Sequence, residues 1–563
     1  MKKLVNDPRH VVREMLEGLV ALNPAQALLE GEDVVIRAGL PEAARRKVAV
    51  ISGGGAGHEP AHAGYVGEGM LSAAVTGDVF TSPSTDAVLA GIRAVAGPAG
   101  ALLVVKNYTG DRLNFGLAAE LARAEGIPAE IVVVADDVAL RATVEPERRR
   151  GIAGTVLVHK LAGAAAEQGL PLAEVARLAR EAAAETGSMG VALGACTVPA
   201  AGQPGFALGE EEVELGLGIH GEQGVERGVL RPADGLVETL LAAILEDRGL
   251  RAGDHVALLV NGLGGTPPME LAIVARRALF LLRERGLVVE RAWAGNFLTA
   301  LEMPGCSLSL LRLDEARRDL LDAPAGAPAW PGGGHVPARP GLVPAPAPAD
   351  GDAAERASGP LSGPLRRAAL AVAAAVEAAE AELTALDSRA GDGDLGISLA
   401  RGAAAIRALP ETAFADAPET LARIGGALRR AIAGSSGPFY ATALLRAARG
   451  LPPEPGLADW AAAFQRGVDA IAELGGARPG DRTMLDALHP AAEAFQAELE
   501  AGRPAPEAWA AAVRAAGDGA ERTARMRPRL GRASYLGERA LGVPDAGAAA
   551  AVVWLRALAA VPS

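Results

Sequence analysis

The stretch Lys47-Val48-Ala49-Val50-Ile51-Ser52-Gly53-Gly54-Gly55-Ala56-Gly57-His58 indicates how the first half of this chain folds. Its apolar run predicts a buried parallel strand, and the glycines after Ser52 predict a tight turn at the strand's end. Similar runs at 101–105 and 130–134 are separated by helical stretches, including 114–124. This alternation is typical of a layered α/β domain.

The pattern continues on both sides of this core. Apolar spacing predicts a helix over 8–29, and an alanine-rich region over 155–186 also reads as helical. A second α/β unit is indicated by strand-like runs at 255–260 and 307–311 and by helices at 233–246 and 268–285. We therefore expect one α/β subdomain at 1–186 and another at 187–330.

The composition changes sharply after this region. Residues 331–363 are rich in proline, alanine and glycine, which predicts a semi-extended linker. Almost everything beyond it has helical spacing, so we expect an all-helical domain at 364–563. Its expected helices span 365–386, 418–433, 460–473, 483–500, 505–525 and 546–559.

Bulk composition excludes several classes of protein. A net charge of −13 argues against a nucleic-acid surface. No run approaches about 18 uninterrupted apolar residues, so no membrane span is expected. Two cysteines, Cys196 and Cys306, cannot form a disulfide framework in a chain of this size, so a reducing, cytoplasmic setting is the simplest expectation.

Three short stretches of the α/β half carry candidate chemistry. His220 lies between Gly218 and Gly221, where an uncrowded imidazole is expected, although a loop histidine without a task is the more frequent case. His58 follows the glycines of the first stretch, as suits a small polar ligand and proton transfer. Asp111 follows the run at 101–105, where ligands of open α/β sheets bind, although a lone aspartate more often caps a turn.

The helical half carries three carboxylates close together, Asp387, Asp392 and Asp394. Like charges this close repel unless a cation joins them, so they predict Mg²⁺ ligands, with a solvated acidic loop as the alternative. The spacing does not fit an EF-hand, which needs a glutamate at the twelfth loop position. Downstream, residues 434–438 offer a possible phosphate cradle before a helix.

Taken together, the motifs at 53–60, 107–111, 218–222, 391–394 and 531–537 resemble those of the single-chain, ATP-dependent dihydroxyacetone kinases, and they occur in that family's order. The resemblance covers almost the whole chain outside the linker. It implies a pair of α/β subdomains that binds the ketone and a C-terminal helical barrel that binds ATP and Mg²⁺. The expected reaction is phosphorylation of dihydroxyacetone to dihydroxyacetone phosphate.

The resemblance also implies a role for each matching position. His220 is similar to the residue that forms a covalent hemiaminal with the ketone, His58 to the acid/base residue, and Asp111 to the group that holds or deprotonates the reacting hydroxyl. Substrate-loop contacts are implied for Gly55, Ala56, Gly57 and Lys106, and Mg²⁺ ligation for Asp387, Asp392 and Asp394. The implied nucleotide site comprises Leu395, Gly396, Ile397, Ser398, Ser435, Ser436, Gly475, Met484, Arg532, Asp545, Ala546 and Gly547.

Three departures from the family pattern bear on substrate preference. Ala56 stands where serine is common, Gln223 where proline is common, and Leu395 where a polar residue often sits. The alternatives are therefore a kinase for erythrulose or glyceraldehyde, a non-enzymatic ketone sensor, a subunit fed by a phosphocarrier protein, and an additional FAD-cyclising activity. The intact aspartates disfavour the sensor, and the fused helical domain disfavours the phosphocarrier.

The long linker bears on assembly. The aspartates lie far from His220 in sequence, so the helical domain must close over a ketone site of its own chain or of a partner. The compositionally distinct stretch 323–364, about 40 residues long, permits both arrangements. Because closed two-fold pairs are the commonest oligomers, we expect a homodimer.

Overall fold

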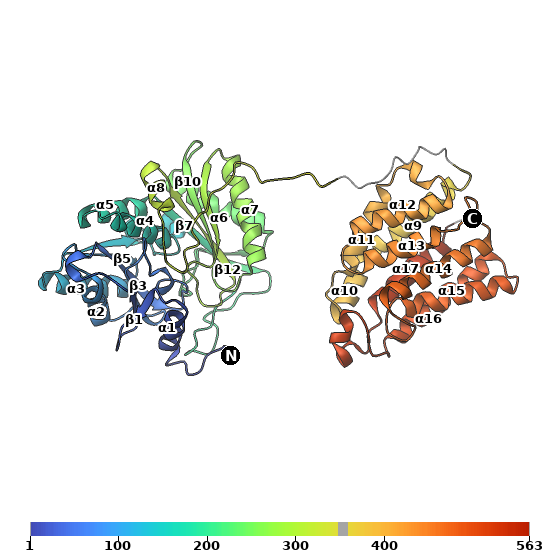
Figure 1. Cartoon of the computed structure of the whole chain (residues 1–563), viewed down its shortest axis with the longest axis horizontal. Helices are drawn as coiled ribbons and strands as arrows, with labels where there is room; N and C mark the ends of the chain where they lie inside the picture. The colour runs from blue at the N-terminus through green and yellow to red at the C-terminus, as the bar shows by residue number, and fades with distance from the viewer. Residues whose placement is uncertain (1, 347–358, 562–563) are drawn as a thin grey trace. The chain divides into compact units, whose positions relative to one another are not determined.

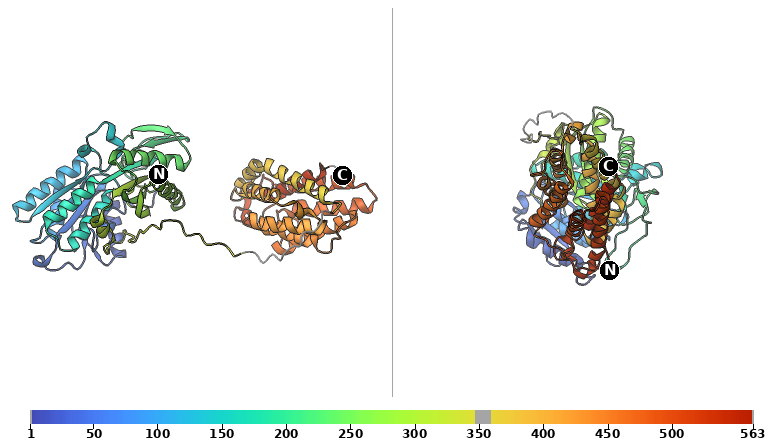
Figure 2. Two further views of the ribbon diagram at one scale, coloured as in Figure 1. Left: turned by 90° about the horizontal axis from the view of Figure 1, so that it is seen from above. Right: turned by 90° about the vertical axis from the view of Figure 1, so that its right-hand side faces the viewer.

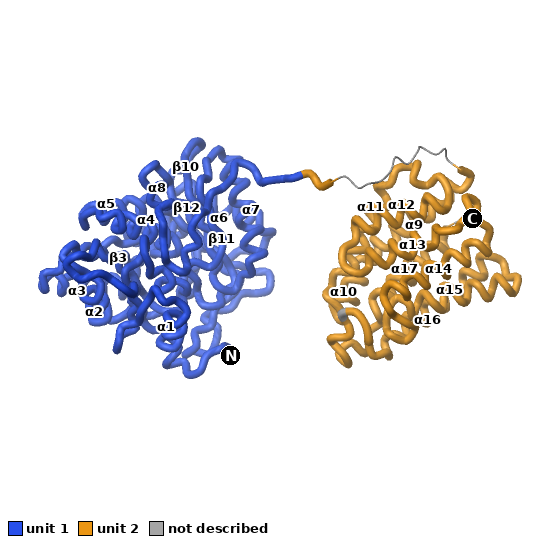
Figure 3. Tube along the Cα trace, in the orientation of Figure 1, with its two compact units in different colours: residues 1–343 blue, residues 344–563 orange. Residues whose placement is uncertain are grey.

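The computed structural model describes residues 2–346 and 359–561, so the predicted linker at 331–363 lies partly outside the described residues. The chain divides into two compact units, residues 1–343 and 344–563 (Figure 3). The first contains two mixed β-sheets with covering helices, and the second is all-helical. Within the described ranges, no helix is both long enough and apolar enough to cross a membrane.

The first sheet has six strands in the order β1-β2-β4-β3-β5-β6. Its strands β1, β3 and β5 are labelled in Figure 1. The strands are β1 (Gln26–Leu28), β2 (Val34–Arg37), β3 (Ala49–Ala56), β4 (Ala73–Val79), β5 (Ala101–Lys106) and β6 (Ala129–Val134). The predicted parallel strand is confirmed, because β3 pairs in parallel with both β4 and β5. The carboxyl ends of these strands therefore meet at one edge of the sheet.

The predicted turn directly after Ser52 is wrong, because Gly53, Gly54 and Gly55 belong to β3 itself. A Cβ atom on Gly53 would lie 2.2 Å from the Val75 carbonyl oxygen, and one on Gly55 would lie 2.5 Å from the Thr81 nitrogen. The glycines thus allow neighbouring backbone to approach the strand closely. The chain turns only after Ala56.

Helices cover both faces of this sheet. Alternate residues of β3 and β5 face opposite layers, with α2 (Thr85–Val95) and α3 (Thr109–Ala124) on one side and α4 (Thr155–Glu167) and α5 (Leu172–Ala184) on the other. The helix predicted over 8–29 is shorter: α1 spans Val11–Leu22. It ends there because Asn23 and Pro24 follow, and the chain then forms β1.

The second sheet has the order β11-β10-β12-β7-β8-β9. It contains β7 (Thr186–Ala192), β8 (Glu212–Leu215), β9 (Glu226–Val229), β10 (His255–Gly262), β11 (Val288–Gly295) and β12 (Gly305–Arg312). Apart from the parallel pair β10–β11, the neighbouring strands pair antiparallel. Helices α6 (Ala233–Arg248) and α7 (Pro268–Glu284) share a core with this sheet, while α8 (Glu315–Asp322) joins the core of α4.

The second unit consists of nine described α-helices that run side by side (Figure 2). They are α9 (Ser362–Ala378), α10 (Glu380–Ala390), α11 (Leu395–Arg407), α12 (Ala417–Ala431), α13 (Ser436–Ala448), α14 (Leu457–Gly475), α15 (Leu485–Glu500), α16 (Ala505–Thr523) and α17 (Ala546–Ala559). The single helix predicted over 365–386 is two helices, because Ala379 leaves the helical conformation. The sequence predicted no bounds for α11 and α13, although it indicated a helix after residues 434–438.

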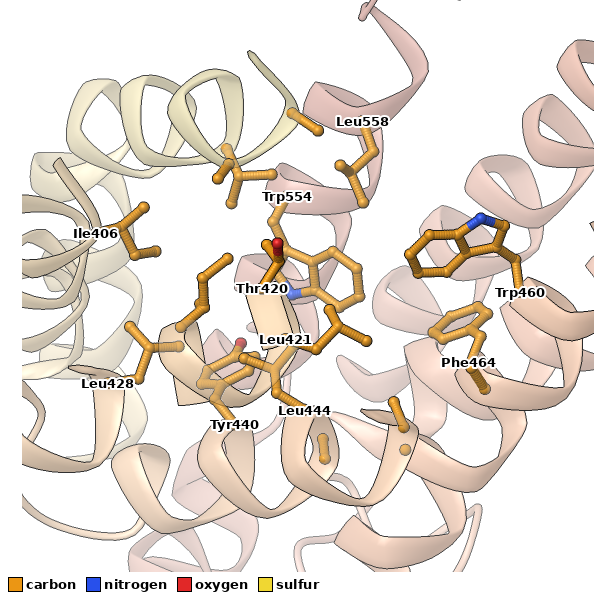
Figure 4. Close-up of a pocket in the computed structure, with 18 of the residues that line it drawn as sticks. Ile406, Thr420, Leu421, Leu428, Tyr440, Leu444, Trp460, Phe464, Trp554 and Leu558 are labelled. Atoms are coloured by element: carbon orange, nitrogen blue, oxygen red, sulfur yellow. The ribbon is translucent and has the colours of Figure 1, made fainter. Parts of the chain in front are cut away.

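The interior of the helical unit contains an apolar cavity of about 560 Å³. Eight of the nine helices contribute to its lining; α10 does not. Trp460 and Phe464 of α14 project toward it from one side, and Trp554 and Leu558 of α17 line it as well (Figure 4). The unit is therefore a barrel whose inner surface is lined almost entirely by hydrophobic side chains.

Candidate functional site

His220 lies in the loop between β8 and β9, where Glu222 fixes its orientation. The imidazole Nδ1 is 2.9 Å from Glu222 Oε1, and the His220 backbone nitrogen donates to Oε2 at 3.0 Å. A carboxylate only accepts, so Nδ1 carries a hydrogen and donates it to Glu222. Gly218 permits this arrangement, since a Cβ atom there would lie 2.0 Å from Glu222 Oε2.

Arg150 also contacts the loop that contains His220. Its Nη2 donates to the Gly216 carbonyl oxygen at 2.7 Å and forms an ion pair with Asp137 Oδ2 at 2.7 Å. Although burial alone would raise the pKa of Glu222, the hydrogen bond and charge of His220 lower it to about 2. Glu222 is therefore ionised at neutral pH and can offset positive charge that develops on the His220 ring.

His58 follows β3 and is fully buried. Its Nδ1 lies 2.7 Å from the Thr299 carbonyl oxygen, an acceptor, so Nδ1 donates and Nε2 keeps a lone pair. Nε2 has no hydrogen-bond partner among the described residues. Burial, followed by the charges of Lys106 and His220, holds the pKa of His58 well below its usual value. The ring is therefore neutral and able to accept a proton.

The fold brings these two histidines together from distant parts of the chain. Their ring centroids are 4.9 Å apart. Phe80 stacks on His58 at 5.1 Å and meets the edge of His220 at 5.2 Å, while Tyr108 lies 4.6 Å from His220. The two imidazole rings thus belong to one cluster of rings with Phe80 and Tyr108.

Lys106 and Asp111 meet beside Gly54. A Cβ atom on Gly54 would lie 3.0 Å from Lys106 Nζ and 3.6 Å from Asp111 Oδ2, so only glycine leaves room for them. Asp111, in the first turn of α3, accepts a hydrogen bond from Ser82. Burial lowers the pKa of Lys106, although Asp111, Glu222 and Glu59 act in the opposite direction. The site therefore combines an amine, a carboxylate and two imidazoles, of which that of His58 is held neutral.

The predicted loop contacts lie at this position too. Gly55 and Ala56 are the last residues of β3, and Gly57 follows them with a φ of 96°. A Cβ atom on Gly57 would lie 2.8 Å from the Phe80 ring. The structure thus gathers Gly55, Ala56, Gly57, His58, Lys106, Asp111 and His220 around one edge of the first sheet.

In the helical unit, Asp387, Asp392 and Asp394 lie where α10 ends and α11 begins. One carboxylate oxygen from each lies within 4.8 Å of the others. Asp387 Oδ2 also accepts from the backbone nitrogens of Asp394 at 3.0 Å and Leu395 at 3.2 Å. Hard carboxylate oxygens held this close fit a small divalent cation such as Mg²⁺.

The predicted nucleotide residues occupy helix ends of the same unit. Leu395, Gly396, Ile397 and Ser398 form the first turn of α11, Ser435 and Ser436 begin α13, Gly475 ends α14, Met484 precedes α15, and Asp545, Ala546 and Gly547 begin α17. A Cβ atom on Gly547 would lie 3.6 Å from Met484 Cβ, so the start of α17 adjoins the start of α15. The side chain of Arg532 lies outside the described part of the structure.

Arg482 is a buried residue that joins several backbone segments of this region by hydrogen bonds. The sequence did not predict this role. Arg482 donates to the carbonyl oxygens of Thr523 at 3.1 Å, Ala540 at 2.8 Å and Val543 at 2.9 Å. Burial raises the pKa of Asp545 to about 6; Arg482 opposes this, and Asp486 and Asp387 add to it. Asp545 therefore lies close enough to sense the charge of the aspartate cluster.

Sequence reasoning also missed Arg150, Tyr108 and Thr299. Glu222 could have been found from the sequence, since it is two residues from His220. Arg150 and Thr299 are distant in sequence, and only the fold brings them to the site. Their roles depend on backbone carbonyl contacts that have no pattern in the sequence.

Two family models match the chain. Residues 17–329 match the Dak1 domain, and residues 389–560 match the DAK2 domain. The first match spans both sheets and contains His58, Lys106, Asp111 and His220. The second contains most of the helical unit, including Asp392 and Asp394.

Several proteins are similar over nearly their whole length. A putative 3,4-dihydroxy-2-butanone kinase of Solanum lycopersicum is 45% identical, covering 99% of this chain and 98% of its own. The triokinase/FMN cyclase of Homo sapiens is 43% identical with the same coverage, and the D-erythrulose kinase of Mycolicibacterium smegmatis is 38% identical, again with that coverage. A solved structure of C. freundii dihydroxyacetone kinase in complex with AMP-PNP and Mg²⁺ is 36% identical with a TM-score of 0.63, covering 99% of both chains.

Proposed function

Because this chain belongs to the dihydroxyacetone kinase family, whose Dak1 and DAK2 domains it carries in one polypeptide, we propose that it transfers a phosphoryl group from ATP to dihydroxyacetone. The product is dihydroxyacetone phosphate. The observation that carries this proposal is the His220–Glu222 pair, whose imidazole ring lies 4.9 Å, between centroids, from the ring of the neutral His58.

We propose that His220 holds the ketone covalently. Attack of Nε2 on the carbonyl carbon forms a C–N bond and moves the carbonyl electron pair onto oxygen. The oxygen gains a proton and Nδ1 loses one, so the hemiaminal is neutral overall. Glu222, 2.9 Å from Nδ1, offsets the positive charge that develops on the ring during attack.

A covalent bond suits so small a substrate. Dihydroxyacetone offers little contact area for recognition, whereas a bond to its carbonyl fixes its orientation. Glycerol has no carbonyl and would be excluded. Lys106, buried beside Gly54, is placed to donate a hydrogen bond to a substrate oxygen.

We propose that His58 and Asp111 prepare the hydroxyl for phosphoryl transfer. Asp111 would hold the hydroxyl, and the Nε2 lone pair of His58 would accept its proton. Mg²⁺ would be held by Asp387, Asp392 and Asp394, where it would neutralise the charge of the ATP phosphates. The helix ends at Leu395–Ser398, Ser435–Ser436 and Asp545–Gly547 would surround the nucleotide with backbone N–H groups.

A second candidate substrate is a four-carbon ketose such as erythrulose. Ala56 lacks the hydroxyl that serine would bring to the substrate loop, and two similar proteins carry names that refer to four-carbon substrates. The reaction would be the same, since only the carbonyl and one hydroxyl take part in it.

The adduct is tested by mass spectrometry of the protein trapped with dihydroxyacetone. The protein is denatured without a reducing agent and digested rapidly. The added mass of one dihydroxyacetone should then be found on the peptide that contains His220. His255→Ala is the matched control, because His255 is an exposed histidine of the same unit that also contacts a carboxylate. An undiminished adduct in His220→Ala would show that another residue holds the ketone.

We further propose that the chain works as a homodimer in which the tethered helical unit serves a ketone site. The linker raises the local concentration of the helical unit without fixing which site it serves. Mixing His220→Ala protein with Asp392→Ala protein decides between the two arrangements. Regained activity after verified subunit exchange indicates transfer between chains, and no regained activity indicates transfer within one chain.

A further inference from the structure

A cluster of buried polar side chains behind the ketone site takes no part in the steps above. Ser52, His62, Thr155 and His159 are each at most 4% exposed. Ser52 belongs to β3, Thr155 and His159 lie one turn apart on α4, and His62 lies in the segment after β3. These groups therefore occupy the layer between the first sheet and α4.

The hydrogen bonds of Ser52 determine which nitrogen of His62 carries the proton. The Ser52 hydroxyl donates its one hydrogen to the Val104 carbonyl oxygen at 2.7 Å. Its 3.5 Å contact with His62 Nδ1 can then only be one in which Nδ1–H donates. His62 Nε2 therefore carries a lone pair, and it has no acceptor or donor partner within the described ranges.

His159 continues the cluster. Its ring meets the edge of the His62 ring with centroids 5.2 Å apart, and neither of its nitrogens has a hydrogen-bond partner in the part of the chain that the structure describes. The same holds for the Thr155 hydroxyl. Tyr65, on the other side of His159, differs because its hydroxyl donates to the Phe297 carbonyl oxygen at 2.7 Å.

Lys106 extends into this layer from β5. Ser52 is paired with Val104, so Lys106, two residues further on, lies beside Gly54 on the same face of the sheet. Its ammonium group is fully buried, and none of the described residues accepts a hydrogen bond from it. After burial, the charge of Lys106 is the next largest cause that lowers the pKa of both His62 and His159. Lys106 therefore lies on the same face of the sheet as Ser52, whose hydroxyl contacts His62.

We propose that His62 and His159 are positioning residues for Lys106, and that they do so by holding ordered water against its ammonium group. Buried polar groups without partners are costly, and internal waters typically satisfy about three such groups each. The lone pair of His62 Nε2, a nitrogen of His159 and the Nζ hydrogens supply those partners. The role rests on the proposed function, because Lys106 is useful only if it meets a ketone.

In this arrangement the water would help the buried Lys106 to keep its charge, which burial alone disfavours. Water on the α4 side takes part of the hydrogen-bonding capacity of Nζ and leaves the rest directed at the substrate beside Gly54. Removing the acceptor destabilises the charged form, so Lys106 would lose its proton at a lower pH. The titratable and aromatic groups that face Lys106 are Glu59, His58 and His62 after β3, Tyr108 and Asp111 at the start of α3, His159 on α4, and Glu222 in the loop after β8.

The water itself is tested by a high-resolution crystal structure of the ketone-free full chain. Electron density for a water within hydrogen-bonding distance of Lys106 Nζ and of His62 Nε2 or a His159 nitrogen is expected. A dry or side-chain-filled gap would overturn the proposal. Because no ketone is present, this result is independent of whether the chain proves to be a ketose kinase.

The functional role is tested by comparing His62→Leu with His62→Gln, which restores an acceptor near the position of Nε2. His62→Leu should raise the dihydroxyacetone concentration needed for half-maximal adduct formation about tenfold, as expected for the loss of one hydrogen bond to a charged group. The pH at which adduct formation declines on the alkaline side (the alkaline limb) should be about one unit lower in His62→Leu. His62→Gln should restore both this pH and the half-maximal dihydroxyacetone concentration. Tyr65→Phe controls for altered packing in the same layer, because it removes a hydroxyl that does not face Lys106.

Two outcomes of this comparison would overturn the role. One is a His62→Leu protein that folds normally and keeps the alkaline limb of the wild type. The other is a Tyr65→Phe protein that shifts the limb as far as His62→Leu does, which would make packing the cause.

Discussion

Replacing Glu222 with glutamine should slow attack on the ketone about tenfold. Glutamine keeps the shape of the side chain but removes the negative charge that lies 2.9 Å from His220 Nδ1. A pKa lowered from 4.5 to about 2 corresponds to about 3 kcal/mol of preference for the charged form. The side chain is 38% exposed, so solvent screening reduces this to roughly 1.5 kcal/mol, which corresponds to about tenfold in rate.

The assay is kcat/KM for dihydroxyacetone, measured together with the rate at which the His220 adduct forms. Both should fall by the same factor in Glu222→Gln, because the charge acts on the covalent step. Glu226→Gln is the matched control, since Glu226 is an exposed carboxylate at the end of the same loop. Thermal unfolding should show that both proteins fold.

A Glu222→Gln protein within twofold of the wild type in both quantities would refute the reasoning. It would mean that the carboxylate orients the loop without acting on the charge of the ring. An equal loss in Glu226→Gln would instead point to the general electrostatic field of the loop.

Two further predictions address the metal and the buried histidines. Asp392→Ala should reduce phosphoryl transfer about a thousandfold and leave adduct formation unchanged, since the cluster would hold the metal that neutralises ATP. Glu382→Ala is the control, because Glu382 is an exposed carboxylate of α10. Unchanged turnover in Asp392→Ala would refute the assignment. Burial and Lys106 lower the pKa of His159 from 6.5 to about 3, so below pH 6.5 the unfolded chain binds a proton there that the folded chain does not. As the pH falls from 6 to 4, His159 should therefore lower the free energy of unfolding of the first unit by about 1.4 kcal/mol per pH unit. His159→Phe should remove that part of the slope in pH-dependent denaturant unfolding, and an unchanged slope would contradict a neutral, buried His159.

The α/β alternation and the helical second unit were predictable because each rests on local apolar spacing. The aspartate cluster was predictable for a similar reason, since its three residues lie within eight consecutive positions of the sequence. The glycines of β3 were misread as a turn, because their purpose is close approach by Val75 and Thr81 from other segments. Local sequence does not contain such contacts.

The states of His58 and His220 could not be predicted from the sequence for the same physical reason. The tautomer of His58 depends on the carbonyl oxygen of Thr299, and the loop of His220 depends on Arg150. The break between α9 and α10 at Ala379 could not be predicted either, because the sequence there is rich in alanine and has no proline or glycine. Each depends on tertiary structure rather than on neighbouring residues.

The most direct test of the central claim is Mg²⁺-dependent ATP turnover with dihydroxyacetone, erythrulose, glyceraldehyde and glycerol in parallel. A hemiaminal-forming kinase should turn over ATP with one or more of the carbonyl substrates and should leave glycerol untouched, because glycerol offers His220 no carbonyl carbon. Turnover of glycerol at a rate equal to that of the best ketose would contradict covalent recognition by His220. Absence of turnover with every carbonyl substrate would contradict the proposed kinase activity itself.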